Sequence, residues 1–166
     1  MISPFFLALL VSTTFLCALV AGFLFAFAVV GMPGLGRLDD GAFLRAFQAM
    51  DRVIQDNHPL FLTVWVGSVV TLVASALLGL SQLGGLDRLL LLTATAAYVV
   101  GVQVPTAAVN VPLNNAVQAV DVEASDGPAR AAARAAFEAR WTRWNRIRTV
   151  VACAVAFLLL ALLVRL

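Results

Sequence analysis

The chain has 166 residues, of which 62% are hydrophobic and only 12% are charged. A soluble domain of this length is nearer half apolar and a quarter charged, so the composition excludes an ordinary soluble domain. The net charge of +2 comes from arginines interleaved with acids, a pattern that disfavours nucleic-acid binding.

Four uncharged runs predict four transmembrane helices. They cover residues 2–36, 59–86, 89–120 and 149–164. Each contains a stretch close to the roughly 18–20 apolar residues that cross a bilayer as a helix, and the last is the shortest. Because backbone groups in lipid must be hydrogen-bonded within their own segment, we expect an all-α bundle of four transmembrane helices. We expect residues 1–166 to form a single integral membrane domain embedded in the lipid bilayer, with spans near 4–31, 59–80, 87–111 and 147–165.

The first run is interpreted as a retained helix rather than a signal peptide. Residues 1–4 supply no Lys or Arg, and the apolar run is about twice the length of a signal-peptide core. Cys17 and Cys153 both lie inside predicted spans, where packing is the usual role of a free cysteine. With one histidine and no carboxylate inside the spans, we expect no metal site.

The first long loop is predicted to contain an amphipathic helix. The sequence MPGLG at 32–36 interrupts the first helix, and Asp39 and Asp40 are N-cap candidates for the next one. The apolar residues that then recur at helical spacing are Phe43, Phe47, Met50 and Ile54. We expect this helix to lie on the membrane interface or beneath the bundle.

The distribution of arginine predicts the orientation in the membrane. Nine of the eleven arginines lie in the segments at about 32–58 and 115–148, and only Arg88 and Arg165 lie on the side of the termini. Because cytoplasmic loops carry an excess of basic residues, we expect both long loops in the cytoplasm and both termini outside a cell (inner) membrane. The lack of lysine and the scarcity of isoleucine indicate a GC-rich, bacterial genome.

The second long loop is predicted to turn at residues 125–128 and then to form a helix that continues into the last span. Spacings of four, three, four and three residues place five side chains in one stripe of this helix. They are Arg134, Glu138, Trp141, Asn145 and Arg148. Residues such as Arg134 and Glu138 more commonly belong to a solvated, salt-bridged helix face. The other three lie where the helix enters the apolar layer, so we interpret them as candidate site residues.

Carboxamides and prolines mark the end of the third span. Asn110 and Asn114 are one helical turn apart, while Pro105 and Pro112 remove backbone donors and free carbonyl groups one turn earlier. Such a segment is tolerated when it lines a cavity or when side chains satisfy it. The polar residues higher in the span are Gln103, Thr106 and Tyr98, and Gly101 leaves room beside them.

The topology of four spans brings these motifs to one membrane face. The first span reaches this face near residues 32–34, the second begins there at Asn57 and His58, the third ends there and the fourth departs from it. We therefore predict a polar-lined pocket with an arginine at its floor. The alternative is that the amides only cap helix ends and join helices, contacts worth about 0.6–2 kcal/mol each in membranes.

Several of these motifs resemble the anthrone oxygenase-like membrane protein family, much of which has no assigned reaction. The resemblance spans nearly the whole chain, and the order of the motifs agrees. The motifs are G-x-x-F-x-F at 22–27, MPGL at 32–35, FQAM at 47–50 with Arg52 and Ile54, Asn57, Y-x-x-G at 98–101, NVPLN at 110–114 and W-x-x-x-N-x-x-R at 141–148. The chain departs from the family pattern at Asp51, where we expect an asparagine, and at His58.

The resemblance implies a function. Fungal members oxidise polyketide anthrones to anthraquinones, so the expected reaction is oxidation of a lipophilic anthrone- or quinol-type aromatic, with dioxygen as co-substrate and no bound cofactor. The chemistry needs a base, donors for an enolate oxygen and an apolar pocket. The expected donors are Arg148, Asn145, Asn110 and Asn114, and the expected base is His58, with Asp51 and Glu138 as alternatives. The residues expected to contact the substrate are Trp141, Tyr98, Asn57, Phe25, Phe27 and Gln48.

Two other functions stay open at this point. The same pocket suits a non-enzymatic membrane protein that binds a quinone, a lipid or a hydrophobic metabolite, or a subunit of a larger membrane complex. Transport has less support, because the chain has no internal inverted repeat and no carboxylate at mid-membrane depth. A homo-oligomer would still be able to build a pathway between its copies.

Overall fold

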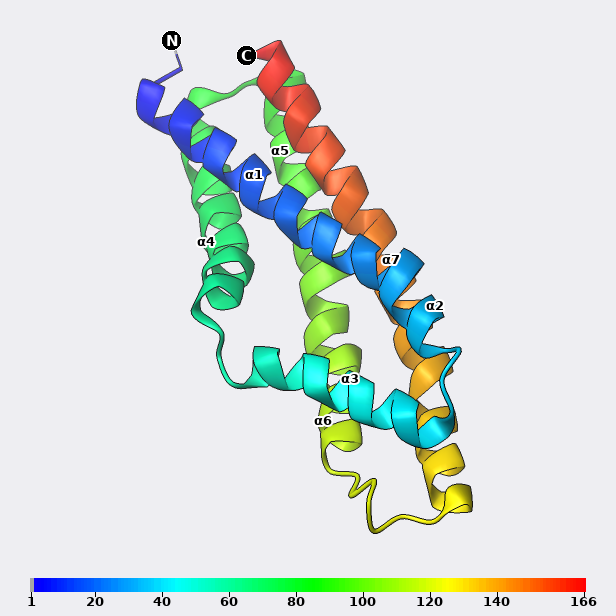
Figure 1. Cartoon of the computed structure of the whole chain (residues 1–166). Coiled ribbons are helices and arrows are strands. Elements are labelled where there is room, and N and C mark those ends of the chain that lie inside the picture. The colour runs from blue at the N-terminus through cyan, green and yellow to red at the C-terminus, as the bar shows by residue number, and fades with distance from the viewer. Residues whose placement is uncertain (1) are drawn as a thin grey trace.

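The computed structural model describes residues 2–166, and these residues form helices joined by short loops, with no strand (Figure 1). The elements in chain order are α1 (Pro4–Ala26), η1 (Phe27–Gly31), α2 (Met32–Leu35), α3 (Asp40–Gln55), α4 (Pro59–Gln82), α5 (Gly85–Tyr98), η2 (Val99–Gln103), η3 (Thr106–Asn110), α6 (Val111–Gln118) and α7 (Gly127–Arg165). The helical stretches long and apolar enough to cross a bilayer are Pro4–Leu35, Pro59–Gln82, Gly85–Gln118 and Gly127–Arg165. The predicted all-α, four-helix membrane bundle is confirmed.

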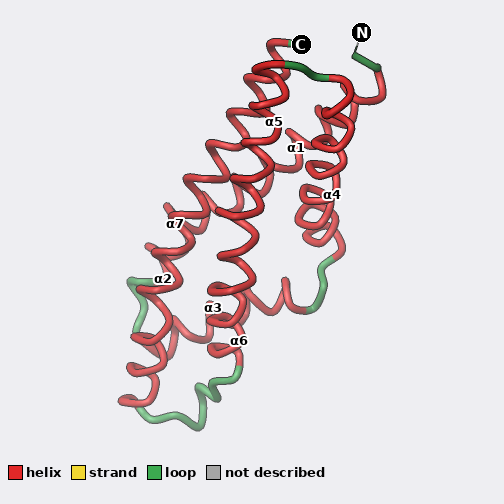
Figure 2. The backbone as a smooth tube through the Cα atoms, turned by 180° about the vertical axis from the view of Figure 1, so that it is seen from behind, coloured by secondary structure: helices red, strands yellow, loops and turns green. Residues whose placement is uncertain are grey.

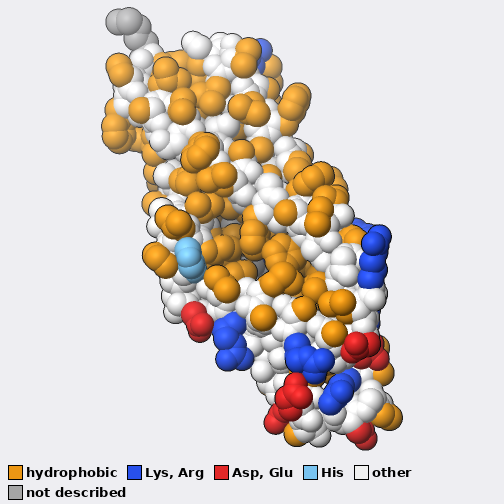
Figure 3. All heavy atoms as spheres, viewed as in Figure 1, with side chains coloured by type: hydrophobic (Ala, Val, Ile, Leu, Met, Phe, Trp, Pro, Cys, Tyr) orange, Lys and Arg blue, Asp and Glu red, His pale blue; other side chains and the backbone are white. Residues whose placement is uncertain are grey.

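The two ends of the bundle differ in character. Both chain termini lie at one end, and the loops at residues 36–58 and 119–126 lie at the other, which we term the loop end (Figures 1 and 2). Hydrophobic side chains cover the visible face toward the termini, and charged side chains gather at the loop end (Figure 3). The chain is therefore a multi-pass membrane protein, and the placement of its loops in the cytoplasm stays a prediction.

Acidic caps fix where the two amphipathic helical segments begin. The Oδ1 atom of Asp39 accepts a hydrogen bond of 2.9 Å from the backbone N–H of Ala42 and so caps α3. That bond lowers the pKa of the Asp39 carboxyl, because it stabilises the ionised form. Asp126 caps α7 in the same way. Of the two cap candidates before α3, Asp39 is the cap, and Asp40 binds Arg134 instead.

Three of the six prolines lie inside helical spans and are accommodated by π-helical turns rather than by breaks. η1, η2 and η3 each end two residues before a proline, at Pro33, Pro105 and Pro112. The residue just before each proline donates its N–H to the carbonyl five residues earlier, as Val111 does to Thr106. Because the wider turn compensates for the missing donor, each helix continues through its proline. The first helix ends within the predicted segment 32–36, after Leu35 and not at Pro33.

α3 lies beneath the bundle, against α6 and α7 (Figure 1). Phe43 and Phe47 are buried on its inner face, as predicted, whereas Met50 is 37% exposed. Gln48 donates from Nε2 to the carbonyl oxygens of Val117 and Val120, at 2.8 and 2.9 Å. These bonds hold α3 against the end of α6.

α7 is the unbroken helix predicted from the second loop into the last span. Near its start, Arg134 bonds to Glu138 at 2.7 Å and to Asp40 at 3.1 Å, so these charges join the loops to one another. Further along, α7 approaches η2 closely. A Cβ atom added to Gly101 would lie 2.7 Å from Cγ1 of Val151, so only glycine fits there.

Candidate functional site

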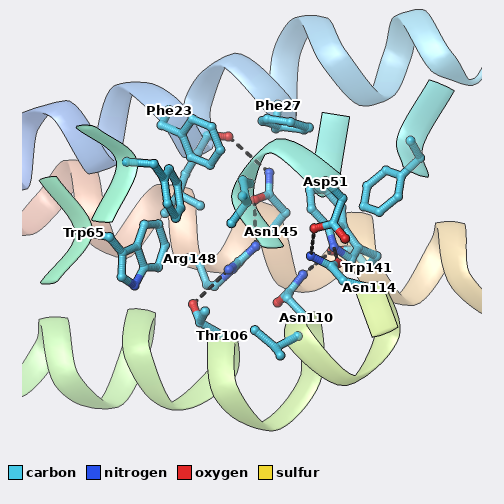
Figure 4. Close-up of a pocket in the computed structure, with 15 residues that line it drawn as sticks. Phe23, Phe27, Asp51, Trp65, Thr106, Asn110, Asn114, Trp141, Asn145 and Arg148 are labelled. Atoms are coloured by element: carbon cyan, nitrogen blue, oxygen red, sulfur yellow. Dashed lines mark hydrogen bonds between the residues drawn. The ribbon is translucent and has the colours of Figure 1, made fainter. Parts of the chain in front are cut away.

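A cavity of about 150 Å³ lies in the half of the bundle nearest the loop end. Figure 4 shows the residues that line it. All four spans and α3 contribute to its wall. The lining residues are Phe23, Leu24, Phe27, Phe47, Asp51, Ile54, Phe61, Trp65, Thr106, Asn110, Val111, Asn114, Trp141, Asn145 and Arg148. The cavity therefore combines many apolar side chains with a few polar ones, as ligand sites in proteins do.

Six aromatic rings form a continuous arc along the cavity wall. Consecutive rings along the arc have centroids 5.1–5.8 Å apart. In order, the rings belong to Trp65, Phe61, Phe23, Phe27, Trp141 and Phe47. These separations are typical of favourable edge and offset contacts, and the arc offers ring faces and edges to a flat aromatic ligand.

Arg148 is a buried cation in the cavity wall, with 4% of its surface exposed. Its guanidinium donates from Nη1 to Oγ1 of Thr106 at 2.8 Å and from Nη2 to Oδ1 of Asn145 at 3.0 Å. The ion pairs found in residues 2–166 are Arg45–Glu123, Arg134–Asp40, Arg134–Glu138 and Arg165–Asp87. Arg148 therefore has no carboxylate partner within the described chain, and its charge is available to a ligand.

Two buried asparagines from different spans have their amides fixed by backbone carbonyls, and one of them, Asn145, holds Arg148. Asn145 donates from Nδ2 to the carbonyl oxygen of Leu24 at 3.1 Å, which ties α7 to α1 and fixes the amide that holds Arg148. Asn110 donates from Nδ2 to the carbonyl oxygen of Trp141 at 3.4 Å. Both asparagines are almost fully buried. The arrangement fixes the guanidinium and the amide of Asn110 before any ligand binds.

A second polar group surrounds Asp51, which is 3% exposed. Its Oδ1 accepts from Nδ2 of Asn114 at 2.7 Å, and its Oδ2 accepts from Gln55 at 2.7 Å and Gln118 at 3.0 Å. Asn114 in turn accepts from Nε1 of Trp141 at 2.7 Å. All three partners of Asp51 are amide donors, which suits a carboxylate because a carboxylate only accepts.

The cavity opens on the side opposite α7. Its lining residues on α7 are all buried, whereas those on α1, α3 and α4 include half-buried side chains such as Phe23, Ile54 and Phe61. Figure 3 shows apolar side chains around a hollow beside His58, above the charged loop end. Apolar side chains therefore form most of the rim of this mouth.

The structure brings six of the predicted site residues together at the cavity. They are Arg148, Asn145, Asn110, Asn114, Trp141 and Phe27. They come from three separate spans, so the expected convergence of motifs near the loop end is present in the fold. The chemical roles given to these residues stay predictions.

The other five predicted residues do not line the cavity. Tyr98 is buried next to Ser68, with their hydroxyl oxygens 2.7 Å apart, and Gln48 bonds to backbone carbonyls. Phe25 is 51% exposed on the outer face of α1. Asn57 and His58 are exposed in the turn before α4, where Asn57 has a φ of +59°. Of the three candidate bases, only Asp51 reaches the cavity.

Sequence reasoning missed several residues of the cavity wall. These are Phe23, Phe47, Phe61, Trp65 and Thr106 as ligand contacts. Phe23 and Phe27, like Phe61 and Trp65, are four residues apart, a spacing that places both rings of a pair on one face of a helix. That spacing was the available signal, but long apolar runs contain many such pairs.

Residues 2–166 contain no group of three or more His, Cys, Asp and Glu side chains placed to hold a metal ion. The cavity itself supplies one carboxylate, several amides and one guanidinium as its polar groups. This donor set suits hydrogen bonding to an organic oxygen better than metal coordination. The expectation that no cofactor is bound stays a prediction.

A family model described as anthrone oxygenase matches residues 57–159. The matched segment contains α4, α5, α6 and most of α7, and with them Asn110, Asn114, Trp141, Asn145 and Arg148. No curated protein and no solved structure matches the chain. Because the family match covers more than half of its length, the chain belongs to the anthrone oxygenase family.

Proposed function

We propose that this protein is a membrane-embedded oxygenase that oxidises a lipophilic anthrone- or quinol-type aromatic with dioxygen. The observation that carries the proposal is the cavity. Its wall combines an arc of six aromatic rings with a buried Arg148 that has no carboxylate partner in the described chain. Membership of the anthrone oxygenase family supports the same chemistry. The expected co-substrate is dioxygen, and no bound cofactor is expected.

The size of the cavity favours a flat substrate that enters from the bilayer. About 150 Å³ is the size of an engineered cavity that holds a benzene ring. A fused-ring substrate therefore places one ring against Trp141 and Arg148, and its remaining rings extend through the mouth past Phe23 and Phe61. The exposed apolar surface around the mouth gives such a molecule a direct route from lipid.

Asp51 is the proposed base. It is the one carboxylate in the described wall of the cavity, and it lies across that cavity from Arg148 (Figure 4). Transfer of a substrate proton to Asp51 leaves the total charge of the cavity unchanged, because the carboxylate becomes neutral as the substrate becomes an anion. The new negative charge then lies closer to Arg148, where a low dielectric strengthens the attraction.

Arg148 is the proposed stabiliser of the substrate anion. Removing the acidic proton from the CH₂ carbon of an anthrone places negative charge on the carbonyl oxygen, and a fixed guanidinium favours that charge without reorganising. Thr106 and Asn145 keep the guanidinium in place. Asn110 lies beside it as a further amide in the wall.

The remaining steps need only the substrate and dioxygen. The enolate gives one electron to dioxygen, and the two radicals combine to a peroxide at the former CH₂ carbon. The proton held by Asp51 returns to the peroxide, and the resulting hydroperoxide loses water to leave a second carbonyl. One anthrone and one dioxygen thus give one anthraquinone and one water.

Oxygen uptake by the purified protein with anthrone as substrate tests the proposal. We expect Arg148→Ala to lower kcat/KM about 100-fold or more, because the anion loses its buried charge partner. Arg146→Ala is the matched control, since Arg146 is exposed on the same helix and should leave uptake unchanged.

Two results would contradict this function. Turnover of Arg148→Ala at the wild-type rate removes the role given to Arg148. Saturable binding of anthrone or a quinone by wild type without any oxygen consumption favours the non-enzymatic binding protein instead.

A further inference from the structure

Two buried polar atoms in the cavity wall have no hydrogen-bond partner within residues 2–166: Nε of Arg148 and Oδ1 of Asn110. Arg148 is 4% exposed and Asn110 is 2% exposed, so bulk water does not cover them. Leaving such atoms unpaired is costly, and native proteins pair the large majority of their buried side-chain polar atoms. Both residues line the same cavity, so its ligand is the natural partner of both atoms.

Neighbouring bonds fix the direction of each atom. Nη1 and Nη2 of Arg148 bond to Thr106 and Asn145, which leaves Nε as the guanidinium nitrogen without a partner. Nδ2 of Asn110 bonds toward Trp141, so its oxygen points the other way. In Figure 4 that oxygen lies on the side of Asn110 that faces Arg148 and Thr106.

The two atoms have opposite hydrogen-bonding character. Nε of a guanidinium is only a donor, and Oδ1 of an amide is only an acceptor. A ketone or ether oxygen on the ligand accepts from Arg148 and leaves Asn110 unpaired. A hydroxyl group both accepts and donates, so one hydroxyl oxygen satisfies both atoms at once.

We propose that the cavity binds its aromatic ligand through a hydroxyl group, which accepts from Nε of Arg148 and donates to Oδ1 of Asn110. The preferred ligands are then phenols, naphthols, hydroquinones and the enol tautomers of aryl ketones. Asn110 is the residue that distinguishes this hydroxyl from a carbonyl. Arg148 donates a hydrogen bond to either kind of oxygen.

This inference rests on the proposed function only in that an aromatic ligand occupies the cavity. For an anthrone it means that the enol tautomer is the neutral form that fits best, since its one oxygen is a hydroxyl. Both tautomers give the same anion on losing a proton. In the enol tautomer the departing proton is the one on the hydroxyl, whereas Asp51 takes the CH₂ proton of the keto tautomer. The choice of tautomer therefore changes recognition of the neutral substrate and the proton that leaves, while the net reaction stays the same.

Binding of 1-naphthol and 1-tetralone to the purified protein tests the inference. The two molecules share a carbon skeleton, but the first carries a hydroxyl and the second a ketone. Quenching of tryptophan fluorescence, with free ligand measured in each detergent solution, gives both Kd values. We expect wild type to bind 1-naphthol about tenfold more tightly, because the ketone leaves Oδ1 of Asn110 unpaired.

Three variants test whether Oδ1 of Asn110 causes the preference for 1-naphthol. Asn110→Leu should bring the two Kd values together, since it removes the acceptor. Asn110→Asp should keep the preference for 1-naphthol, because a carboxylate oxygen accepts at the same position. Asn115→Leu is the matched control, since Asn115 is exposed on the same helix and does not line the cavity.

Equal Kd values in wild type overturn the inference, as does failure of 1-naphthol to bind. A preference that survives in Asn110→Leu shows that another group accepts the hydroxyl proton. If Asn110→Leu does not fold, wild type and Asn110→Asp still decide the matter. The experiment uses no oxygen, so a protein that fails to oxidise anthrone still confirms or refutes this mode of binding.

Discussion

Asp51 is one of the two residues at which the chain departs from its family resemblance, and it is also the one carboxylate in the described cavity wall. An asparagine there would have similar size but would replace one acceptor oxygen by a donor. That donor would face amide groups that already donate, from Gln55 and Gln118. The carboxylate is thus matched to its surroundings, and its presence gives this chain a base that an amide does not supply.

Substitution of Asp51 tests the base directly. We expect Asp51→Asn to lower kcat for oxygen uptake about 100-fold, because an amide does not take the substrate proton. The Kd for 1-naphthol should stay close to that of wild type, which separates a loss of chemistry from a loss of binding. Asp56→Asn, at an exposed carboxylate just after α3, is the control. Unchanged turnover in Asp51→Asn would show that the proton leaves by another route.

The sequence identified the buried amides and Arg148 for a physical reason. Polar groups at the ends of apolar spans need partners, and four antiparallel crossings bring alternate ends together, so Asn110, Asn145 and Arg148 were predicted to meet. His58 was adjacent to this set in sequence, but the turn at Asn57 leaves it exposed before α4. Such a turn depends on local backbone angles that periodicity does not encode.

At the scale of elements, amphipathic helices were the easiest features to predict. α3 has apolar residues at helical spacing and an acidic cap, and α7 begins at a proline turn and carries its polar stripe into the membrane. Both were predicted and both are present. In α4 large apolar side chains occur on every face, so no period separated Phe61 and Trp65 from residues that face outward.

The π-helical turns explain why the third span was harder to predict. Each π turn adds a residue to one turn of helix and shifts the face that the following side chains occupy. η2 and η3 both lie between Tyr98 and Asn114. The two π turns therefore rotate Asn114, relative to Tyr98, away from the face that it would occupy in a regular helix. Asn110 and Asn114 reach the cavity, while Tyr98 binds Ser68 in the core.

The contact between η2 and α7 gives a prediction at this scale. Gly101→Ala should lower the free energy of unfolding by about 1–2 kcal/mol, because the new methyl group would overlap Val151. Val151→Ala in the same chain should restore most of the loss. Thermal unfolding in detergent measures both. Gly22→Ala is the control, since nothing lies within 4 Å of its added Cβ, and it should be neutral or slightly stabilising. Equal losses at both glycines would contradict the close contact.

At the scale of the whole molecule, the cavity lies between two hydrophobic clusters. One joins the four spans toward the termini, around Leu72, Tyr98 and Leu159. The other joins α3 and the loops to the start of α7, around Phe47 and Phe137. The cavity occupies the junction because polar residues from the third span, the fourth span and α3 meet there and cannot pack as a hydrophobic core. Because the cavity lies beside the loop end, the orientation of the bundle decides from which side of the membrane a substrate enters.

Cysteine labelling tests that orientation. In a chain in which Cys153 and Cys17 are replaced by alanine, Ser81→Cys reports on the end of the termini and Asp121→Cys on the loop end. Nine of the eleven arginines lie on the loop side, and basic loops are retained in the cytoplasm. A membrane-impermeant maleimide should therefore label Ser81→Cys in intact cells and Asp121→Cys only after permeabilisation. The reverse pattern would place the cavity mouth in the outer leaflet, and a substrate would then have to reach the enzyme from outside the cell.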